Sequence, residues 1–324
     1  MKVLNEDIKS KQFKAVYLLC GEEEYLKRQY KQRLREAIIP ADDTINYAFF
    51  EGKQAVVGQI IDLAETLPFF TERRLIIVEN SGFFKKGGAD LADYLKNMPT
   101  TSCLVFIEQE IDKRSKLYKT VSSQGHIEEF AFQDESTLKK WVAGLIKKEN
   151  KQINAATIDF LIQKVGTNMD NIFNEIEKLF CYTYSRDVIL GADVEAVCTT
   201  QISNHIFEMI EAVSRGNQAK ALSLYYELLA LKEAPLGILF LLTRQYRLII
   251  QAKAMVALGR GKAQVAKDIG VHPFAAGKYM EQSRRYNHQQ LVAVLNMAAS
   301  FEEKIKTGLL QDKIGVELFI IQNT

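Results

Sequence analysis

The sequence predicts an α/β domain, with a parallel sheet flanked by helices, followed by two domains that are helical throughout. Over residues 1–134, short β-branched runs alternate with amphipathic stretches, which is typical of a parallel sheet covered by helices. From residue 135 onward, the strand pattern gives way to apolar residues at helical spacing. A polar junction near residues 200–204 divides the helical part. We therefore expect domains over residues 1–134, 135–204 and 205–324.

Five apolar runs are expected to form the strands of the first domain. They cover residues 15–20, 47–50, 75–78, 103–107 and 127–130. Between the first two, the apolar residues of 22–38 recur at helical spacing, which predicts a buried helix face. Pro40 ends this helix, because its ring blocks continuation. Shorter helices are expected near residues 60–65 and 89–96.

The helical part begins at residue 135, where Asp134 or Ser136 can act as the N-cap of a helix that runs to Lys148. We expect no strands beyond this point. The further helices are expected over residues 154–165, 168–182, 193–199, 206–215, 218–231, 235–258, 262–268, 273–284 and 288–307.

The composition is that of an ordinary soluble globular protein. Of the 324 residues, 47% are hydrophobic and 25% are charged, and 42 basic side chains against 40 acidic ones leave a net charge of +2. The longest strongly apolar stretch, residues 236–242, is far short of the ~20 residues that span a bilayer. The N-terminus lacks the apolar core of a secretion signal. We expect a cytoplasmic protein with no membrane partner.

Neither a disulfide framework nor a metal site is indicated. The cysteines, Cys20, Cys103, Cys181 and Cys198, contain no C-x-x-C pair and lie in apolar segments, so we expect buried free thiols. The histidines are scattered and have no cysteine partner at ligand spacing. We expect no metal and no cofactor.

The first strand ends in Gly21 and leads into a helix, which is where a nucleotide-binding α/β domain places its phosphate loop. Such a loop needs more glycines, a lysine and a Ser or Thr, because backbone amides, a cation and a hydroxyl hold the phosphates and Mg²⁺. Here Glu22, Glu23 and Glu24 follow a single glycine, and their charges repel a triphosphate. We expect no ATP binding at this position; a weak ATPase is the alternative.

The strand at 75–78 is followed by Glu79 and Asn80, where an ATPase would carry an Asp-Glu pair that positions metal and water. Asn80 cannot accept a proton from water, so we expect a structural or solvated role for this pair. No Ser/His/Asp set, G-x-S-x-G motif or reactive cysteine signature occurs elsewhere. The sequence therefore predicts an enzyme-like scaffold without catalytic residues.

Leu67, Phe69 and Phe70 surround Pro68, just before the strand at 75–78. Pro68 disfavours continued helix, so the two phenylalanines are expected in a turn, where adjacent side chains diverge. Two such rings can contribute several kcal/mol of apolar transfer energy to the binding of a partner, at roughly 25 cal/mol per Å². The alternative is that Phe69 or Phe70 closes the bottom of its own sheet.

The C-terminal third of the chain is basic. Residues 211–324 carry 15 basic and 9 acidic side chains, against 27 and 31 in residues 1–210. Arg244 and Arg247 are three apart in the expected helix at 235–258, so they share a face on which DNA phosphate contacts can form. A solvated face or a subunit interface is the alternative.

A DNA-binding regulator with a helix-turn-helix motif is a further alternative. Residues 264–274 contain a turn at Gly270, and a basic segment follows at 278–285. However, Pro273 and Phe274 stand where polar, base-reading side chains should begin. Packing within the helical domain explains the segment more simply.

Five blocks of sequence, taken together and in order, resemble the delta subunit family of bacterial DNA polymerase III. The resemblance runs over essentially the whole chain, and the five blocks in this order are specific. They are 17–23, 67–75, 112–119, 174–179 and 305–308.

The resemblance implies an AAA+-like first domain, a small helical lid domain and an all-α collar domain that joins a heteropentameric clamp loader. In this family the first domain opens the sliding clamp during DNA replication by inserting a hydrophobic plug, which by position is Leu67, Phe69 and Phe70. Family members usually lack a usable phosphate loop. Related subunits carry a Ser-Arg-Cys motif near residues 121–126, where this chain has no arginine, so no arginine finger is expected.

The resemblance also implies the partners of the chain. They are the sliding clamp (beta subunit), the delta-prime and tau or gamma subunits of the loader, and primed DNA within the complex. No catalysis by this chain is expected, although the holoenzyme to which it would belong is a DNA-directed DNA polymerase, a nucleotidyltransferase.

Overall fold

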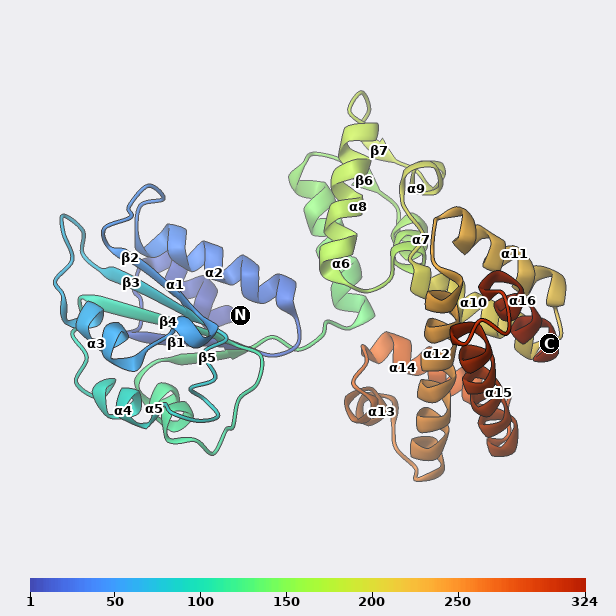
Figure 1. Ribbon diagram of the computed structural model, residues 1–324. Helices are drawn as coiled ribbons and strands as arrows, with labels where there is room; N and C mark the ends of the chain where they lie inside the picture. The colour runs from blue at the N-terminus through green and yellow to red at the C-terminus, as the bar shows by residue number, and fades with distance from the viewer. The chain divides into compact units, whose positions relative to one another are not determined.

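A computed structural model describes all residues, 1–324, and forms two compact units, Met1–Gln133 and Asp134–Thr324 (Figure 1). The first is a parallel α/β unit and the second is almost entirely helical, so the expected fold class is confirmed. No helix in either unit combines the length and the apolar character that crossing a bilayer requires.

A five-stranded parallel sheet forms the centre of the first unit, with its strands in the order β2-β3-β4-β1-β5. The strands are β1 (Val16–Cys20), β2 (Tyr47–Glu51), β3 (Arg74–Glu79), β4 (Ser102–Glu108) and β5 (His126–Glu129). All five expected strands are present, with bounds shifted by one residue at most. β1 and β4 are buried along their whole length, which explains why the sequence there shows continuous apolar runs.

Helices cover both faces of this sheet, as Figure 1 shows. They are α1 (Lys2–Ser10), α2 (Glu24–Ile38), α3 (Val57–Glu65), α4 (Ala89–Tyr94) and α5 (Lys116–Gln124), with a short 3₁₀ helix η1 (Gly52–Gln54). Alternate residues of β1 serve opposite faces. Val16 and Leu18 share a core with residues of α3, α4 and α5, whereas the Tyr17 hydroxyl donates to Asp7 of α1 at 2.8 Å. α1, which precedes the first strand, was not among the expected helices, whereas α5 lies in a gap between two expected strands, where a helix without stated bounds was expected.

The second unit begins with helices α6 (Glu135–Lys148), α7 (Ala155–Val165), α8 (Met169–Tyr182) and α9 (Gly191–Val197). Two short strands, β6 (Gln152–Ile153) and β7 (Val188–Ile189), pair in parallel, so the expectation of no strands beyond residue 135 is wrong. The Lys151 ammonium donates to the carbonyl oxygens of Thr183 and Arg186 and so ties the two strand ends together. Strands this short leave no periodic signal in a sequence.

The remaining helices surround α12 (Pro235–Ala257). They are α10 (Ile202–Ser214), α11 (Gln218–Ala230), α13 (Lys262–Ile269), α14 (Pro273–Ser283), α15 (His288–Lys306) and α16 (Asp312–Gln322), and all of them contact α12. α16 lies beyond the last expected helix. The first unit ends at Gln133, and the expected division of the second unit at residue 204 stays a prediction.

The segment that resembles a helix-turn-helix is packed into this bundle. Val265 of α13 and Tyr279 of α14 are buried in the same core as α12. The Lys278 ammonium lies 5.3 Å from the centre of the Phe207 ring and 5.0 Å from that of Phe274, and burial lowers the pKa of Lys278. Key side chains of α14 therefore serve packing.

The cysteine expectation holds for three positions and is wrong for one. Cys20, Cys103 and Cys198 are buried free thiols, and burial raises their pKa values. Cys181 is exposed, because it lies on the outer side of the last turn of α8.

Candidate functional site

The loop of residues 66–73 joins α3 to β3 and carries the three apolar side chains that were expected to bind a partner; we call it the apolar loop. It lies at the amino end of β3, next to the amino end of β2, because these strands are parallel and Tyr47 pairs with Leu75. Gly21 follows the carboxyl end of β1. The apolar loop and the phosphate-loop position therefore occupy opposite edges of the same sheet.

The apolar loop presents its large side chains to solvent. Leu67 is 73% exposed, Phe69 is 56% exposed and Phe70 is 93% exposed. The two rings contact each other edge to face, with centroids 4.2 Å apart. Neither ring closes the bottom of the sheet. The alternative that Phe69 or Phe70 belongs to the core of its own domain is therefore wrong.

The backbone at Phe70 is left-handed, with φ of 57°. For a residue with a large side chain, this conformation costs roughly 1–2 kcal/mol and persists only where the surrounding structure imposes it. The ring of Phe70 is almost fully exposed to solvent. Core packing of this ring therefore does not compensate for the cost of the left-handed backbone.

Asn46 holds the backbone of the apolar loop at Phe69. Its Oδ1 accepts from the Phe69 N–H at 2.7 Å, and its Nδ2 donates to the Phe69 carbonyl at 2.8 Å. Asn46 is 1% exposed and is itself bound by Asp43, which accepts from its N–H and from its side-chain amide. These hydrogen bonds hold the pKa of the Asp43 carboxyl below its ordinary value.

Arg74 holds the other end of the apolar loop. Its buried guanidinium donates to the carbonyl oxygens of Thr66 at 3.1 Å, Ile45 at 3.0 Å and Leu67 at 3.4 Å. The adjacent Arg73 donates to the carbonyl of Phe13 at 2.9 Å. Charge-assisted hydrogen bonds of this kind are about twice as strong as neutral ones, so the apolar loop is fixed before any partner arrives.

The sequence gives no indication that Asn46 supports the apolar loop. Arg74 was expected only as part of the sequence block 67–75, with no role of its own. Asn46 stands 23 residues before Phe69 in the chain, and no periodic or motif signal links a single asparagine to a distant turn. The run Asp43 to Asn46 is typical of a turn with a side-chain acceptor, which is the only local signal in this segment.

The opposite edge of the sheet is occupied by carboxylate–lysine pairs. The ammonium of buried Lys27 contacts Glu24 at 2.7 Å, and Lys31 contacts Glu79 at 2.7 Å. Both lysines lie in the helix that follows Gly21, and each is paired with a carboxylate of the protein itself. A phosphate at this edge would have to displace one of these carboxylates.

Gly21 lies against the backbone of Phe130. A Cβ atom built on Gly21 would approach the Phe130 carbonyl oxygen to 2.3 Å, and the φ of Gly21 is +108°. The Phe130 N–H donates to Cys20, and its carbonyl accepts from Glu23. The single glycine is therefore explained by close packing of two backbone segments.

Glu108, at the carboxyl end of β4, is a buried carboxylate that sequence reasoning did not single out. It accepts from the hydroxyl and N–H of Ser81 and from the N–H of Gly82. Burial raises the pKa of Glu108, and these donors oppose the shift. Because Ser81 and Gly82 directly follow β3, these hydrogen bonds hold the turn after β3 in place, and we assign Glu108 a structural role.

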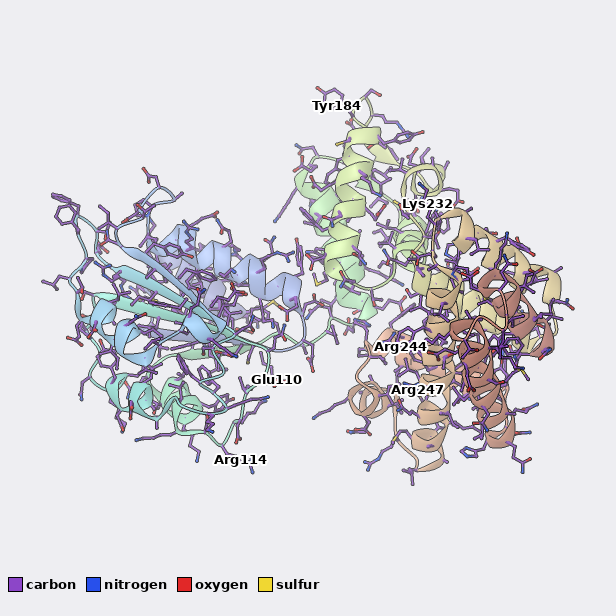
Figure 2. The ribbon with its side chains drawn as sticks, in the orientation of Figure 1. Glu110, Arg114, Tyr184, Lys232, Arg244 and Arg247 are labelled. Carbon is purple, nitrogen blue, oxygen red and sulfur yellow. The ribbon has the colours of Figure 1, made fainter.

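Arg244 and Arg247 lie one above the other along α12 (Figure 2). Both are exposed, and neither forms a salt bridge. They belong to the second unit, whereas the apolar loop belongs to the first.

Two sequence models of one family match the chain. The model described as DNA polymerase III, delta subunit, matches residues 17–130, and the model for the C-terminal domain of the same protein matches residues 203–323. The chain is 28% identical to the DNA polymerase III subunit delta of Bacillus subtilis, over 98% of this chain and 95% of that protein. It is 22% identical to the probable DNA polymerase III subunit delta of Aquifex aeolicus, over 79% of this chain and 75% of that protein.

A solved structure extends the similarity to three dimensions. The Bacillus subtilis DNA clamp loader delta protein is 28% identical and superimposes with a TM-score of 0.81, over 99% of this chain and 98% of that chain.

Proposed function

The chain belongs to the family of DNA polymerase III delta subunits, and we propose that its first unit binds the sliding clamp and opens the ring by inserting Leu67, Phe69 and Phe70 into an apolar pocket. As a delta subunit the chain is a clamp-loader component of DNA polymerase III. The single observation that carries the proposal is a fixed loop whose large apolar side chains are exposed.

The energetics of burial suit this task. Full burial of a Leu or Phe side chain contributes about 1.5–3 kcal/mol, and three such side chains can act as the anchors of a small interface. The loop is already ordered by Asn46 and Arg74, so binding costs little conformational entropy.

Opening requires more than binding. A ligand shifts an equilibrium only by its difference in affinity for the two states, so the apolar loop must bind the open ring more tightly than the closed one. Moving the ring from 1:99 to 99:1 in favour of the open form needs about 5.5 kcal/mol of such difference. Full burial of the three anchors is worth about 4.5–9 kcal/mol in total, so most of this gain would have to be made with the open ring and not with the closed one.

The chain performs no bond chemistry of its own in this proposal. Lys27 and Lys31 are paired with carboxylates at the edge where a nucleotide would bind, and three glutamates follow Gly21. ATP bound by neighbouring loader subunits would control when the apolar loop is presented.

The further partners in this proposal are the delta-prime and tau or gamma subunits and primed DNA. Residues 135–204 would form the lid domain, and residues 205–324 would form the collar domain that joins the loader.

Binding to an immobilised sliding clamp tests the proposal. The double variant Phe69→Ala with Phe70→Ala should lose at least 100-fold in affinity, since two anchors are removed, while its melting temperature stays near that of the wild type. The matched control is Tyr182→Ala with Tyr184→Ala, another exposed aromatic pair, which should bind normally. Equal affinity of the wild type and the phenylalanine variant would refute the proposal.

A further inference from the structure

Up to Lys253, α12 leaves only one narrow stripe of residues uncovered, although six other helices contact it. In its last turn, Val256 and Ala257 are exposed as well. The stripe consists of Gly237, Phe240, Arg244, Arg247, Gln251, Ala254 and Leu258, all of which are exposed. Their spacing alternates between three and four residues, which is the period of a helix–helix seam. From Leu236 to Lys253, all the other residues of α12 are buried or half-buried. We call these seven residues the α12 seam.

The centre of the α12 seam is positively charged. Arg244 and Arg247 have no carboxylate partner, and no acidic residue occurs between Glu233 and Asp268. Figure 2 shows both arginine side chains along the same helix. A surface that meets this centre must supply negative charge, since two unpaired guanidinium groups are otherwise desolvated at a cost.

The ends of the α12 seam are apolar. Phe240 is 64% exposed and Leu258, the residue that caps the helix, is 70% exposed. At 1.5 Å per residue they stand about 27 Å apart along the helix. One small pocket cannot cover both, whereas a single partner helix of about five turns can.

We infer that the α12 seam docks one helix of another clamp-loader subunit, with acidic residues at the centre of that helix and apolar residues near its ends. The inference rests on the proposed function, because it takes the partner from the loader that the chain joins. It specifies which surface of the chain is used and the chemistry of the partner segment.

A second copy of this chain does not fit the α12 seam. In parallel pairing, Arg244 would face Arg244 of the copy. In antiparallel pairing about the centre of the stripe, the two Arg247 side chains would meet. Like charges face each other in both cases, which disfavours self-association and selects an unlike partner.

DNA fits the α12 seam less well than an acidic helix does. Two cations can neutralise about two phosphates, which is a small contribution to DNA affinity. The exposed Phe240 and Leu258 at the two ends have no counterpart on a phosphate backbone. DNA binding is therefore the competing outcome of the test.

The test is the charge reversal Arg244→Glu with Arg247→Glu in the full chain, mixed with the purified loader subunits of the same organism. We expect its apparent affinity for the loader to fall at least tenfold, with the thermal transition unchanged because both side chains are in solvent. The matched control is Lys220→Glu, in the first turn of α11, with Lys232→Glu, two residues after the end of α11. It changes the net charge equally and involves exposed lysines without ion pairs.

A second measurement separates this inference from the proposed function. Binding of the same variants to the isolated sliding clamp should equal that of the wild type, because the apolar loop is unchanged. Normal loader assembly by the arginine variant would overturn the inference and leave clamp binding untouched. Normal assembly with weaker binding of primed DNA would overturn it in favour of a DNA contact, and an equal defect in the lysine control would show a general charge effect and overturn it as well.

Discussion

Asn46 and Phe69 are joined by two hydrogen bonds that run in opposite directions, one to the N–H and one to the carbonyl of Phe69. The arrangement imitates a backbone pair of a sheet, but a buried side chain takes the place of the second strand. It holds the apolar loop in a conformation that exposes both phenylalanine rings. The stability of the first unit and the presentation of the loop therefore depend on the same side chain.

Asn46→Ala should lower both stability and clamp affinity. The variant leaves the Phe69 N–H and carbonyl without their partner, which costs about 1–3 kcal/mol where these groups are buried. The loop would also have to be ordered on binding. Urea unfolding of the full chain and clamp binding are the measurements; unchanged clamp affinity would show that Asn46 does not position the loop.

Phe70→Gly should separate stability from function. Glycine accepts the left-handed backbone without the penalty that Phe70 carries, so the variant should be more stable by about 0.5–1 kcal/mol. It should also bind the clamp much more weakly. Phe70→Ala is the matched control, since it loses the ring and keeps the strained backbone. A destabilised glycine variant would mean that the ring packs within its own subunit.

Acid should weaken the support of the loop through Asp43. Its pKa in the folded protein lies below the ordinary value of 3.8 because Asn46 donates to the charged carboxylate. The stabilisation is therefore complete above about pH 4 and is lost as the pH falls through the lower, folded-state pKa.

The variant Asp43→Asn lacks this titration. The difference in free energy of unfolding between wild type and variant should be constant between about pH 7 and 5 and should shrink below about pH 4. A difference that is the same at pH 7 and pH 3 would assign the support to another group.

Gly21→Ala should be strongly destabilising, by about 3 kcal/mol or more, because its Cβ would overlap the Phe130 carbonyl and its φ is unfavourable. Gly87→Ala is the control: its φ is also positive, but nothing lies within 4 Å of an added Cβ, so about 1 kcal/mol is expected. Urea unfolding compares the two. Equal losses would mean that Gly21 is needed only for its backbone angle.

Much of the sheet could be predicted from the sequence, and the support of the apolar loop could not. β1 and β4 are buried on both faces, so they leave continuous apolar runs that can be recognised locally. Pro68 marks the end of a helix, but the direction of the neighbouring rings depends on Asn46, which is remote in sequence.

The missed elements have similar causes. The buried face of α1 includes Asp7, whose carboxylate accepts a hydrogen bond from the hydroxyl of Tyr17. Because a charged residue occupies this face, the sequence of α1 has no continuous apolar stripe from which the helix could be predicted. β6 and β7 have two residues each, too few for a period, and their ends are fixed by Lys151 through contacts with a distant turn.

Ring opening itself is the most direct test of the account. Two fluorophores placed on either side of one interface of the sliding clamp report the separation of its subunits by energy transfer. Saturating wild-type chain should lower the transfer, and Phe69→Ala with Phe70→Ala should leave it at the level of the free ring at any concentration. Transfer that stays unchanged while the wild-type chain is bound, or that falls equally with the variant, would contradict the account.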